Sequence, residues 1–146
     1  MSGITVIAFD YGLRNIGAAV GQSLTFSARS AGIYKAKDGI PQWQDLLTLI
    51  DEWQAQELVV GLPLNMDGSE SEMSRRAKKF GQRLHGRTGL KVHFTDERLS
   101  SFEAKSIASE QGHKGNYGQA PIDEIAACLI LENWWSEYAA NTQRQC

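Results

Sequence analysis

The stretch Ile4–Gly17, with the sequence ITVIAFDYGLRNIG, decides the fold. Its first half is a run of Ile, Val, Ala and Phe, which is typical of a strand buried on both faces. Asp10 is the first charged residue of the run. Burying an unpaired carboxylate is costly, so we expect Asp10 at the exposed end of the strand, facing a metal, a phosphate or a cap. Gly12 allows a turn, and the apolar run from Gly17 predicts a hairpin.

Strand-like and helix-like patterns alternate along the rest of the chain. In chain order we expect a third strand over 23–34, a polar loop over 35–39, a helix from Pro41, a fourth strand over 57–62, a helix opened by Ser69 and Glu72 at capping-box spacing, a fifth strand over 91–95, a short helix over 100–111, a mobile loop over 112–119 and a final helix from Pro121. A strand, a helix and a strand in succession imply a parallel crossover. The predicted class is α/β, with a mixed five-stranded sheet (a three-strand antiparallel meander plus two parallel strands) and helices on both faces.

Composition sets limits on the function. With 146 residues and 42% hydrophobic content, we expect one domain over residues 1–146. The net charge of −2 means that any nucleic-acid site must come from local clustering of basic residues. Cys128 and Cys146 match neither a disulfide framework nor a metal-ligand spacing. No signal peptide or long apolar span is apparent, which favours a cytoplasmic protein without membrane contact.

Carboxylates occur at three places that the predicted fold could bring together. Asp10 ends the first strand, Asp96 and Glu97 end the fifth, and Asp123 opens the last helix. A two-metal phosphodiester hydrolase needs such a set, because oxygen ligands hold two hard cations about 4 Å apart. Each acid also has a purely structural interpretation, since Asp10 could cap a turn, Asp96 or Glu97 could cap the next helix, and Asp123 could complement a helix N-terminus.

Basic residues cluster within the helix after residue 69 and the start of the next strand. The window 75–91 contains no acid and holds seven basic residues: Arg75, Arg76, Lys78, Lys79, Arg83, Arg87 and Lys91. Such an asymmetry predicts a phosphate-backbone footprint, although a solvated helix face is the alternative. Arg14 and Arg98 lie close in sequence to candidate acids, whereas the three histidines share no spacing that suggests a metal site or a catalytic relay.

Four motifs together resemble the YqgF family of ribonuclease H-like proteins. They are Asp10-x-Gly-x-x-x-x-Gly17, Val59-Val-Gly-Leu-Pro63, Asp96-Glu-Arg-Leu-Ser100 and Asp123-x-x-Ala-Ala127, and they span nearly the whole chain. The resemblance implies a nuclease that processes ribosomal RNA precursor, at the 5′ end of pre-16S rRNA. It also implies that Asp10, Glu97 and Asp123 are catalytic and bind Mg²⁺ or Mn²⁺, with two ions expected. Related junction resolvases carry an acid on the fourth strand, but here that strand ends without one, so the second acid must come from the fifth strand, with Asp96 in reserve.

These observations predict a metal-dependent nuclease whose substrate is held by Arg14, Arg76, Lys79, Arg83 and Arg98. Two alternatives stay open: a Holliday junction resolvase acting on branched DNA, and a non-catalytic RNA- or protein-binding module on a nuclease-like fold. A P-loop is excluded, because Ala18 and Ala19 stand where that motif needs Lys and Ser or Thr. An actin-like or sugar-kinase-like ATPase would need two lobes, and the chain supplies one. The protein could be a monomer or a homodimer.

Overall fold

The computed structural model describes residues 3–96 and 122–144, without the side chains of 122–124 and 140–144. The described elements are β1 (Thr5–Asp10), β2 (Asn15–Gln22), β3 (Arg29–Lys37), β4 (Ile40–Pro41), α1 (Trp43–Trp53), β5 (Glu57–Leu62), α2 (Glu72–Thr88), β6 (Lys91–Asp96) and α5 (Ile122–Arg144). The expected helix over 100–111 and loop over 112–119 lie outside this range. None of the described helices combines the length and apolar character that a membrane crossing needs.

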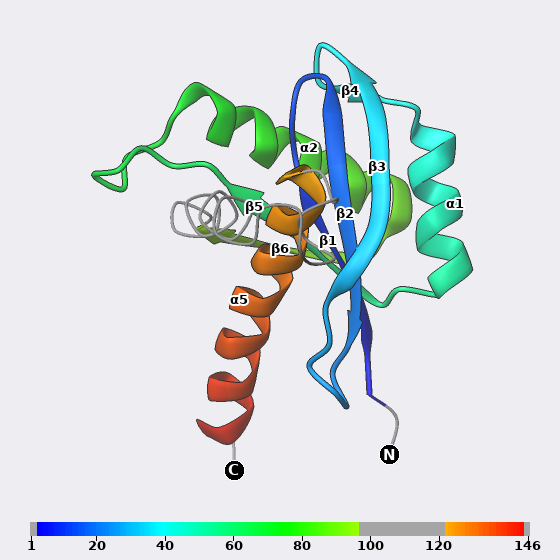
Figure 1. Cartoon of the computed structure of the whole chain (residues 1–146), viewed down its shortest axis with the longest axis vertical. Coiled ribbons are helices and arrows are strands. Elements are labelled where there is room, and N and C mark those ends of the chain that lie inside the picture. The colour runs from blue at the N-terminus through cyan, green and yellow to red at the C-terminus, as the bar shows by residue number, and fades with distance from the viewer. Residues whose placement is uncertain (1–2, 97–121, 145–146) are drawn as a thin grey trace, which may run out of the picture.

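The sheet has the mixed topology that the sequence predicts, with one strand more. Its strand order is β4-β3-β2-β1-β5-β6 (Figure 1). The pairs β1–β2, β2–β3 and β3–β4 are antiparallel, whereas β1–β5 and β5–β6 are parallel. The sixth strand is the two-residue β4, which pairs Pro41 with Ala36. Pro41 therefore belongs to an edge strand, where its missing N–H is tolerated, and α1 begins two residues later than expected.

The expected third strand was placed too early. Residues 23–26 form a turn, and β3 runs from Arg29 to Lys37, through part of the expected polar loop. Leu24 and Phe26 suggested a strand, but both are largely exposed, and Phe26 has a positive φ of 48°. The Phe26 ring instead contacts Trp135 of α5, with the ring centroids 5.8 Å apart.

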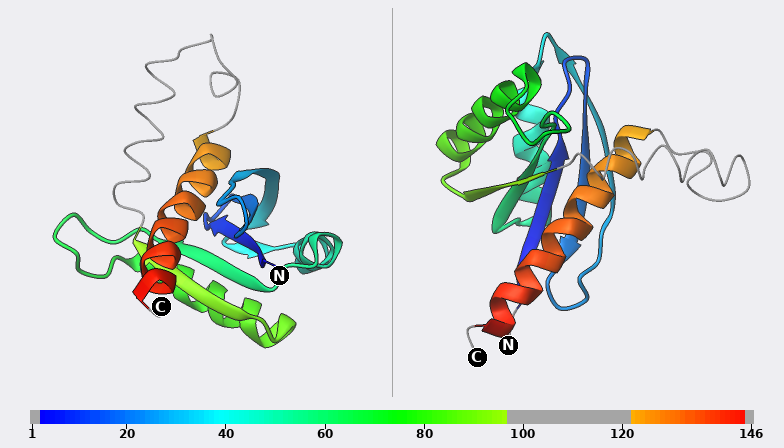
Figure 2. Two further views of the ribbon diagram at one scale, coloured as in Figure 1. Left: turned by 90° about the horizontal axis from the view of Figure 1, so that it is seen from below. Right: turned by 90° about the vertical axis from the view of Figure 1, so that its left-hand side faces the viewer.

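Helices cover both faces of the sheet, as predicted. Side chains of α1 and α2, among them Leu46 and Phe80, share one core cluster with Ile7 and Phe9 of β1. On the other face, α5 packs against Val6 and Ala8 and against parts of β2 and β5. Figure 2 shows α5 on one side of the sheet and α2 on the other. Because neighbouring residues of a strand point to opposite faces, odd-numbered residues of β1 face α1 and α2, and even-numbered residues face α5.

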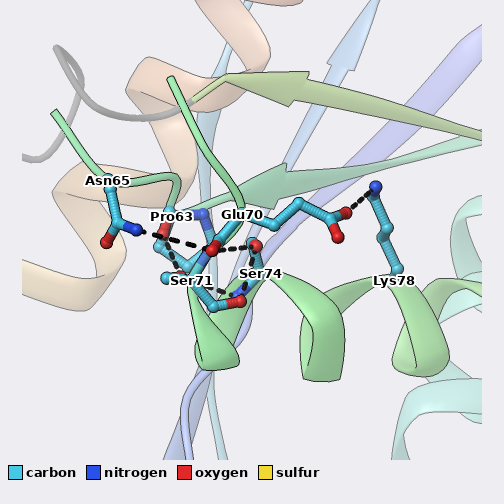
Figure 3. A network of polar contacts seen from close by, with 6 residues as sticks. All are labelled: Pro63, Asn65, Glu70, Ser71, Ser74 and Lys78. Atoms are coloured by element: carbon cyan, nitrogen blue, oxygen red, sulfur yellow. Dashed lines mark hydrogen bonds and ion pairs between the residues drawn. The ribbon is translucent and has the colours of Figure 1, made fainter. Parts of the chain in front are cut away.

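The start of α2 is fixed by a polar network at residue 71 rather than residue 69. Ser71 is the N-cap: its Oγ accepts a hydrogen bond from the Ser74 backbone N–H at 3.0 Å, and the Ser74 Oγ accepts one from the Ser71 N–H at 2.9 Å. The Ser71 hydroxyl also donates to the Pro63 carbonyl at 2.6 Å. The capping box is therefore Ser71 with Ser74 (Figure 3), and it joins the start of α2 to the end of β5.

Candidate active site

Asp10 is the last residue of β1 and lies half-buried beside the hairpin turn, as the sequence predicts. It pairs with Gly17 in the antiparallel ladder. The turn between them is tight, because a Cβ built on Gly12 would lie 2.5 Å from the Asn15 carbonyl oxygen. Strand alternation places Asp10 on the same face as Val6 and Ala8, which is the face that α5 covers.

The helix α5 runs antiparallel to β1. Near its carboxyl end, the Trp135 indole N–H donates to the Ser27 carbonyl at 2.7 Å. Ser27 in turn accepts from the backbone N–H of Gln22, whose partner in the ladder is Thr5 at the amino end of β1. The first turn of α5 therefore points toward the carboxyl end of β1, where Asp10 lies (Figure 1).

The register between helix and strand brings position 123 level with Asp10. Leu131 lies at Gly21, the partner of Val6, because a Cβ on Gly21 would be 3.1 Å from Leu131 Cδ2. Going back eight residues along the helix covers about 12 Å at about 1.5 Å per residue. Going from Val6 to Asp10 covers about 13 Å at about 3.3 Å per residue. The two positions therefore lie at the same height along the sheet.

Small residues let this helix approach the sheet closely. Ala127 is fully buried and shares a core cluster with Ala8 and Ala19. Position 123 lies one helical turn before Ala127, and Asp10 lies two residues beyond Ala8 on the same face. The backbone therefore directs both positions to one corner of the α5 face.

Two further strands end beside Asp10. Phe9 pairs with Val60 in the parallel ladder, so the next step of the register sets Gly61 beside Asp10, and Gly61 pairs with Thr95 of β6. Gly61 places no side chain on this face between β1 and β6. Thr95 is 4% exposed, and a lone Thr within a strand pattern gives no sequence signal of function.

Asp96 faces away from Asp10. Within β6, Val92 and Phe94 point to α2, where both lie against Gly81. His93 points to the opposite face, with its ring 4.9 Å from that of Trp134 in α5. By strand alternation Asp96 belongs to the α2 face and Thr95 to the α5 face. Strand alternation therefore does not favour Asp96, the reserve acid, as a partner of Asp10.

The structure describes the other predicted acids only in part. Glu97 and Arg98 lie outside the described residues, and Asp123 is described only as a backbone position in α5. Among the side chains that the structure does describe, no three of the His, Cys, Asp or Glu type gather as metal ligands. Carboxylate oxygens are nevertheless the ligands that Mg²⁺ and Mn²⁺ prefer, and Asp10 lies where two strand ends and the start of a helix meet.

The basic residues of α2, which form the basic stripe predicted from the sequence, differ in their surroundings. Arg76, Lys79 and Arg83 line one cavity together with Asp38 of the β3–β4 turn. Arg87 instead stacks on Trp43, with its guanidinium carbon 4.3 Å from the ring centroid. Lys78 pairs with Glu70, as Figure 3 shows, and the hydrogen bond from Lys78 lowers the pKa of that carboxyl. The candidate phosphate ligands on α2 are therefore the three that line the cavity.

Arg14 lies close to Asp10 in sequence, whereas the described histidines contact other parts of the fold. Arg14 is exposed in the β1–β2 turn, four residues from Asp10. The His93 imidazole is 2.5 Å from a Glu57 carboxylate oxygen, and His85 Nδ1 is 2.8 Å from the Leu90 carbonyl oxygen. Both histidines therefore have contacts within the protein, while His113 lies outside the described residues.

The sequence matches one protein family over most of its length. The family model is RuvX, described as Holliday junction resolvase, and it matches residues 4–137. Among named relatives, proteins from Saccharophagus degradans and Chromohalobacter salexigens are 54% and 55% identical. The alignments cover 94% and 90% of this chain and 97% and 89% of the relatives. Each of these relatives bears the name "Putative pre-16S rRNA nuclease".

Solved structures with the same fold include Holliday junction resolvases. RuvC of Thermus thermophilus, bound to a Holliday junction, is 15% identical with a TM-score of 0.59 and covers 93% of this chain and 96% of its own. The fowlpox virus resolvase is 11% identical with a TM-score of 0.56, covering 92% of this chain and 99% of its own. At such identities the likeness shows the fold alone. Together with the family match, it identifies this chain as a member of the RuvX (YqgF) family of nucleases with a ribonuclease H-like fold.

Proposed function

We propose that the protein is a metal-dependent nuclease that hydrolyses phosphodiester bonds in the precursor of 16S ribosomal RNA. The observation that carries this proposal is the register of α5, which brings position 123 level with Asp10 on one face of the sheet. An acid at each position gives two carboxylates at one corner, and divalent cations between them would relieve the repulsion of their like charges.

The proposed site consists of Asp10, Glu97 and Asp123 around two Mg²⁺ or Mn²⁺ ions. Such ions would activate the attacking water and stabilise both the attacking and the leaving oxygen. Asp10 would contact both ions, and Glu97 and Asp123 would complete their coordination. The alternation within β6 supports Glu97 over Asp96, because Asp96 shares the α2 face with Val92 and Phe94.

Basic side chains would hold the substrate backbone on both sides of this corner. Arg14 lies on the hairpin turn next to Asp10, and Arg98 follows the proposed second acid in sequence. Arg76, Lys79 and Arg83 extend the surface along α2. Lys and Arg bind nucleic acid chiefly through its phosphates, whatever the base sequence, so these residues would set affinity rather than the cleavage position.

Ribosomal RNA precursor is the favoured substrate because relatives that are 51–55% identical carry the name of a pre-16S rRNA nuclease. Branched DNA is the second candidate, since the family description and the RuvC structure refer to Holliday junctions. A substrate of either kind is compatible with a cytoplasmic protein, which we also propose.

A cleavage assay on both substrates tests the proposal. The purified chain is incubated with the 5′ segment of a 16S rRNA precursor or with a four-way DNA junction, in Mn²⁺, in Mg²⁺ and in a chelator. We expect the RNA to be cut only when a divalent ion is present. Cleavage of the junction alone would reassign the substrate to branched DNA. Failure to cut either substrate would leave a non-catalytic binding module as the better account.

A further inference from the structure

The cavity beside α2 is formed by parts of the chain that are distant in sequence. Its volume is about 210 Å³, and its lining comes from β1–β2, the β3–β4 turn and α2: Tyr11, Asp38, Gly39, Ile40, Arg76, Lys79 and Arg83. The Tyr11 ring is buried and packs on Phe80, with the ring centroids 5.1 Å apart. Its hydroxyl donates to the Gly39 carbonyl at 3.2 Å, which ties the β3–β4 turn to the end of β1.

The backbone of the β3–β4 turn fixes an acid at the edge of this cavity. Gly39 has a φ of +80°, and a Cβ there would lie 1.9 Å from the Tyr11 hydroxyl, so only glycine fits. A hydrogen bond of 2.8 Å from the Gly39 N–H to the Leu13 carbonyl joins this turn to the β1–β2 turn. Asp38, at φ 51°, precedes Gly39 in the left-handed region that Asp and Asn tolerate. The carboxylate is thereby presented to α2.

The lining of the cavity carries more positive than negative charge. An Asp38 oxygen lies 3.4 Å from Nη1 of Arg76. Lys79 and Arg83 follow on the next turns of α2, and within the described part of the chain neither forms an ion pair. Three cations thus line a cavity that contains one carboxylate. The Asp38 side chain is 77% exposed, so its pair with Arg76 is of the weak, solvent-screened kind.

We propose that this cavity binds one backbone phosphate of the nucleic-acid substrate, and that Asp38 competes with that phosphate for Arg76. The inference rests on the proposed function, since it takes the substrate to be a nucleic acid. The cavity lies on the α2 side of the sheet, whereas Asp10 faces α5, so the substrate would cross the β1–β2 turn and its exposed Arg14 to reach both. Asp38 then acts as a built-in competitor that weakens binding.

Binding of a labelled RNA duplex, measured in chelator at several salt concentrations, tests this assignment. Asp38→Asn keeps a residue that tolerates the left-handed backbone and should tighten binding about two- to five-fold. Lys79→Gln with Arg83→Gln should weaken binding and reduce the log–log salt slope by about 0.9, the value for one phosphate. Arg75→Gln with Lys78→Gln is the matched control, because it removes the same charge from the same helix outside the cavity.

The combined variant separates competition from a general charge effect. In the Lys79→Gln, Arg83→Gln background, Asp38→Asn should give a clearly smaller gain, because coupled residues are not additive. The assignment is overturned if Asp38→Asn leaves affinity unchanged, or if the control pair weakens binding as much as the cavity pair. Inorganic phosphate at matched ionic strength should compete only weakly. If free phosphate saturated the cavity at a lower concentration than RNA does, the cavity would be a site for small anions and the proposal would be wrong.

Failure of this inference can be told apart from failure of the proposed function. Cleavage by the wild-type chain together with unaltered binding by the cavity variants would overturn the phosphate subsite alone. The predicted binding pattern without any cleavage in Mn²⁺ would overturn the nuclease alone.

Discussion

At the scale of the residue, the proposed function assigns most of the chemistry to Asp10. The strand delivers it to the face that α5 covers, and Gly17 and Gly61 flank it on the neighbouring strands without side chains. Position alone does not make a catalytic group, since an acid at a strand end can also serve a turn. The two interpretations predict opposite effects of neutralising its charge.

Asp10→Asn keeps the shape of the side chain and removes its charge. We expect metal-dependent cleavage to be lost while the melting temperature stays level or rises, because repulsion between carboxylates is relieved. Parallel cleavage assays and thermal melts measure the two effects. If the variant cuts RNA in Mn²⁺ as well as the parent does, the active site lies elsewhere.

Separate substitutions of the neighbouring residues Asp96 and Glu97 test the choice of second acid that strand alternation favours. Asp96 belongs to the α2 face, so Asp96→Asn should leave cleavage within about twofold of the parent, whereas Glu97→Gln should reduce kcat by at least about 100-fold. Each variant serves as the control for the other in the same kinetic assay. The opposite ranking would make Asp96 the second acid and require a different course of the chain after β6.

At the scale of the element, the start of α2 shows how a helix is anchored to the sheet. Ser71→Ala removes both the cap to the Ser74 N–H and the hydrogen bond to the Pro63 carbonyl. It should cost about 1 kcal/mol of unfolding free energy. Ser69→Ala is the control, because Ser69 lies in the exposed turn before the helix and should cost less than about 0.5 kcal/mol. Denaturant unfolding of both variants gives the comparison, and a larger loss in Ser69→Ala would contradict the observed cap.

The elements themselves were largely predictable, and their errors have physical causes. The strands β1 and β5 can be recognised by their continuous apolar runs, and the amphipathic helices by the helical spacing of their apolar residues. The third strand was misplaced because Leu24 and Phe26 look like strand residues but lie in a turn where Phe26 reaches Trp135. The cap was misplaced because the sequence offers two serines, and the hydrogen bonds that Ser71 forms with Ser74 and with the Pro63 carbonyl select it over Ser69.

The sequence motifs propose a set of site residues, but they carry no information on how those residues are arranged. Motifs single out Asp10 and Asp123, yet their common height depends on Leu131 packing at Gly21 across the sheet. The basic stripe was likewise visible, but the stacking of Arg87 on Trp43 and the approach of Asp38 to Arg76 arise from tertiary contacts. Periodicity carries no information about such contacts, which join residues 38 or more positions apart.

At the scale of the whole molecule, the proposed site depends on α5, which is the last helix of the chain and packs against the first strand. In the proposed site, β1 would supply Asp10 and the last helix, α5, would supply Asp123. If Asp123 is only a favourable charge at a helix N-terminus, Asp123→Asn should cost about 0.3–1 kcal/mol of stability and leave activity intact. If it is a metal ligand near Asp10, the loss should appear in metal binding instead.

Titration of Mn²⁺ into the chain without nucleic acid measures most directly whether Asp123 is a metal ligand. Calorimetry is performed on the parent and on Asp123→Asn, with thermal melts of both proteins in chelator. We predict that the parent binds Mn²⁺, that the variant binds it at least about tenfold more weakly, and that the variant without metal is as stable as the parent or more so. A variant that is less stable than the parent but binds Mn²⁺ equally tightly would contradict the account, because the two remaining acids are too few to hold two ions.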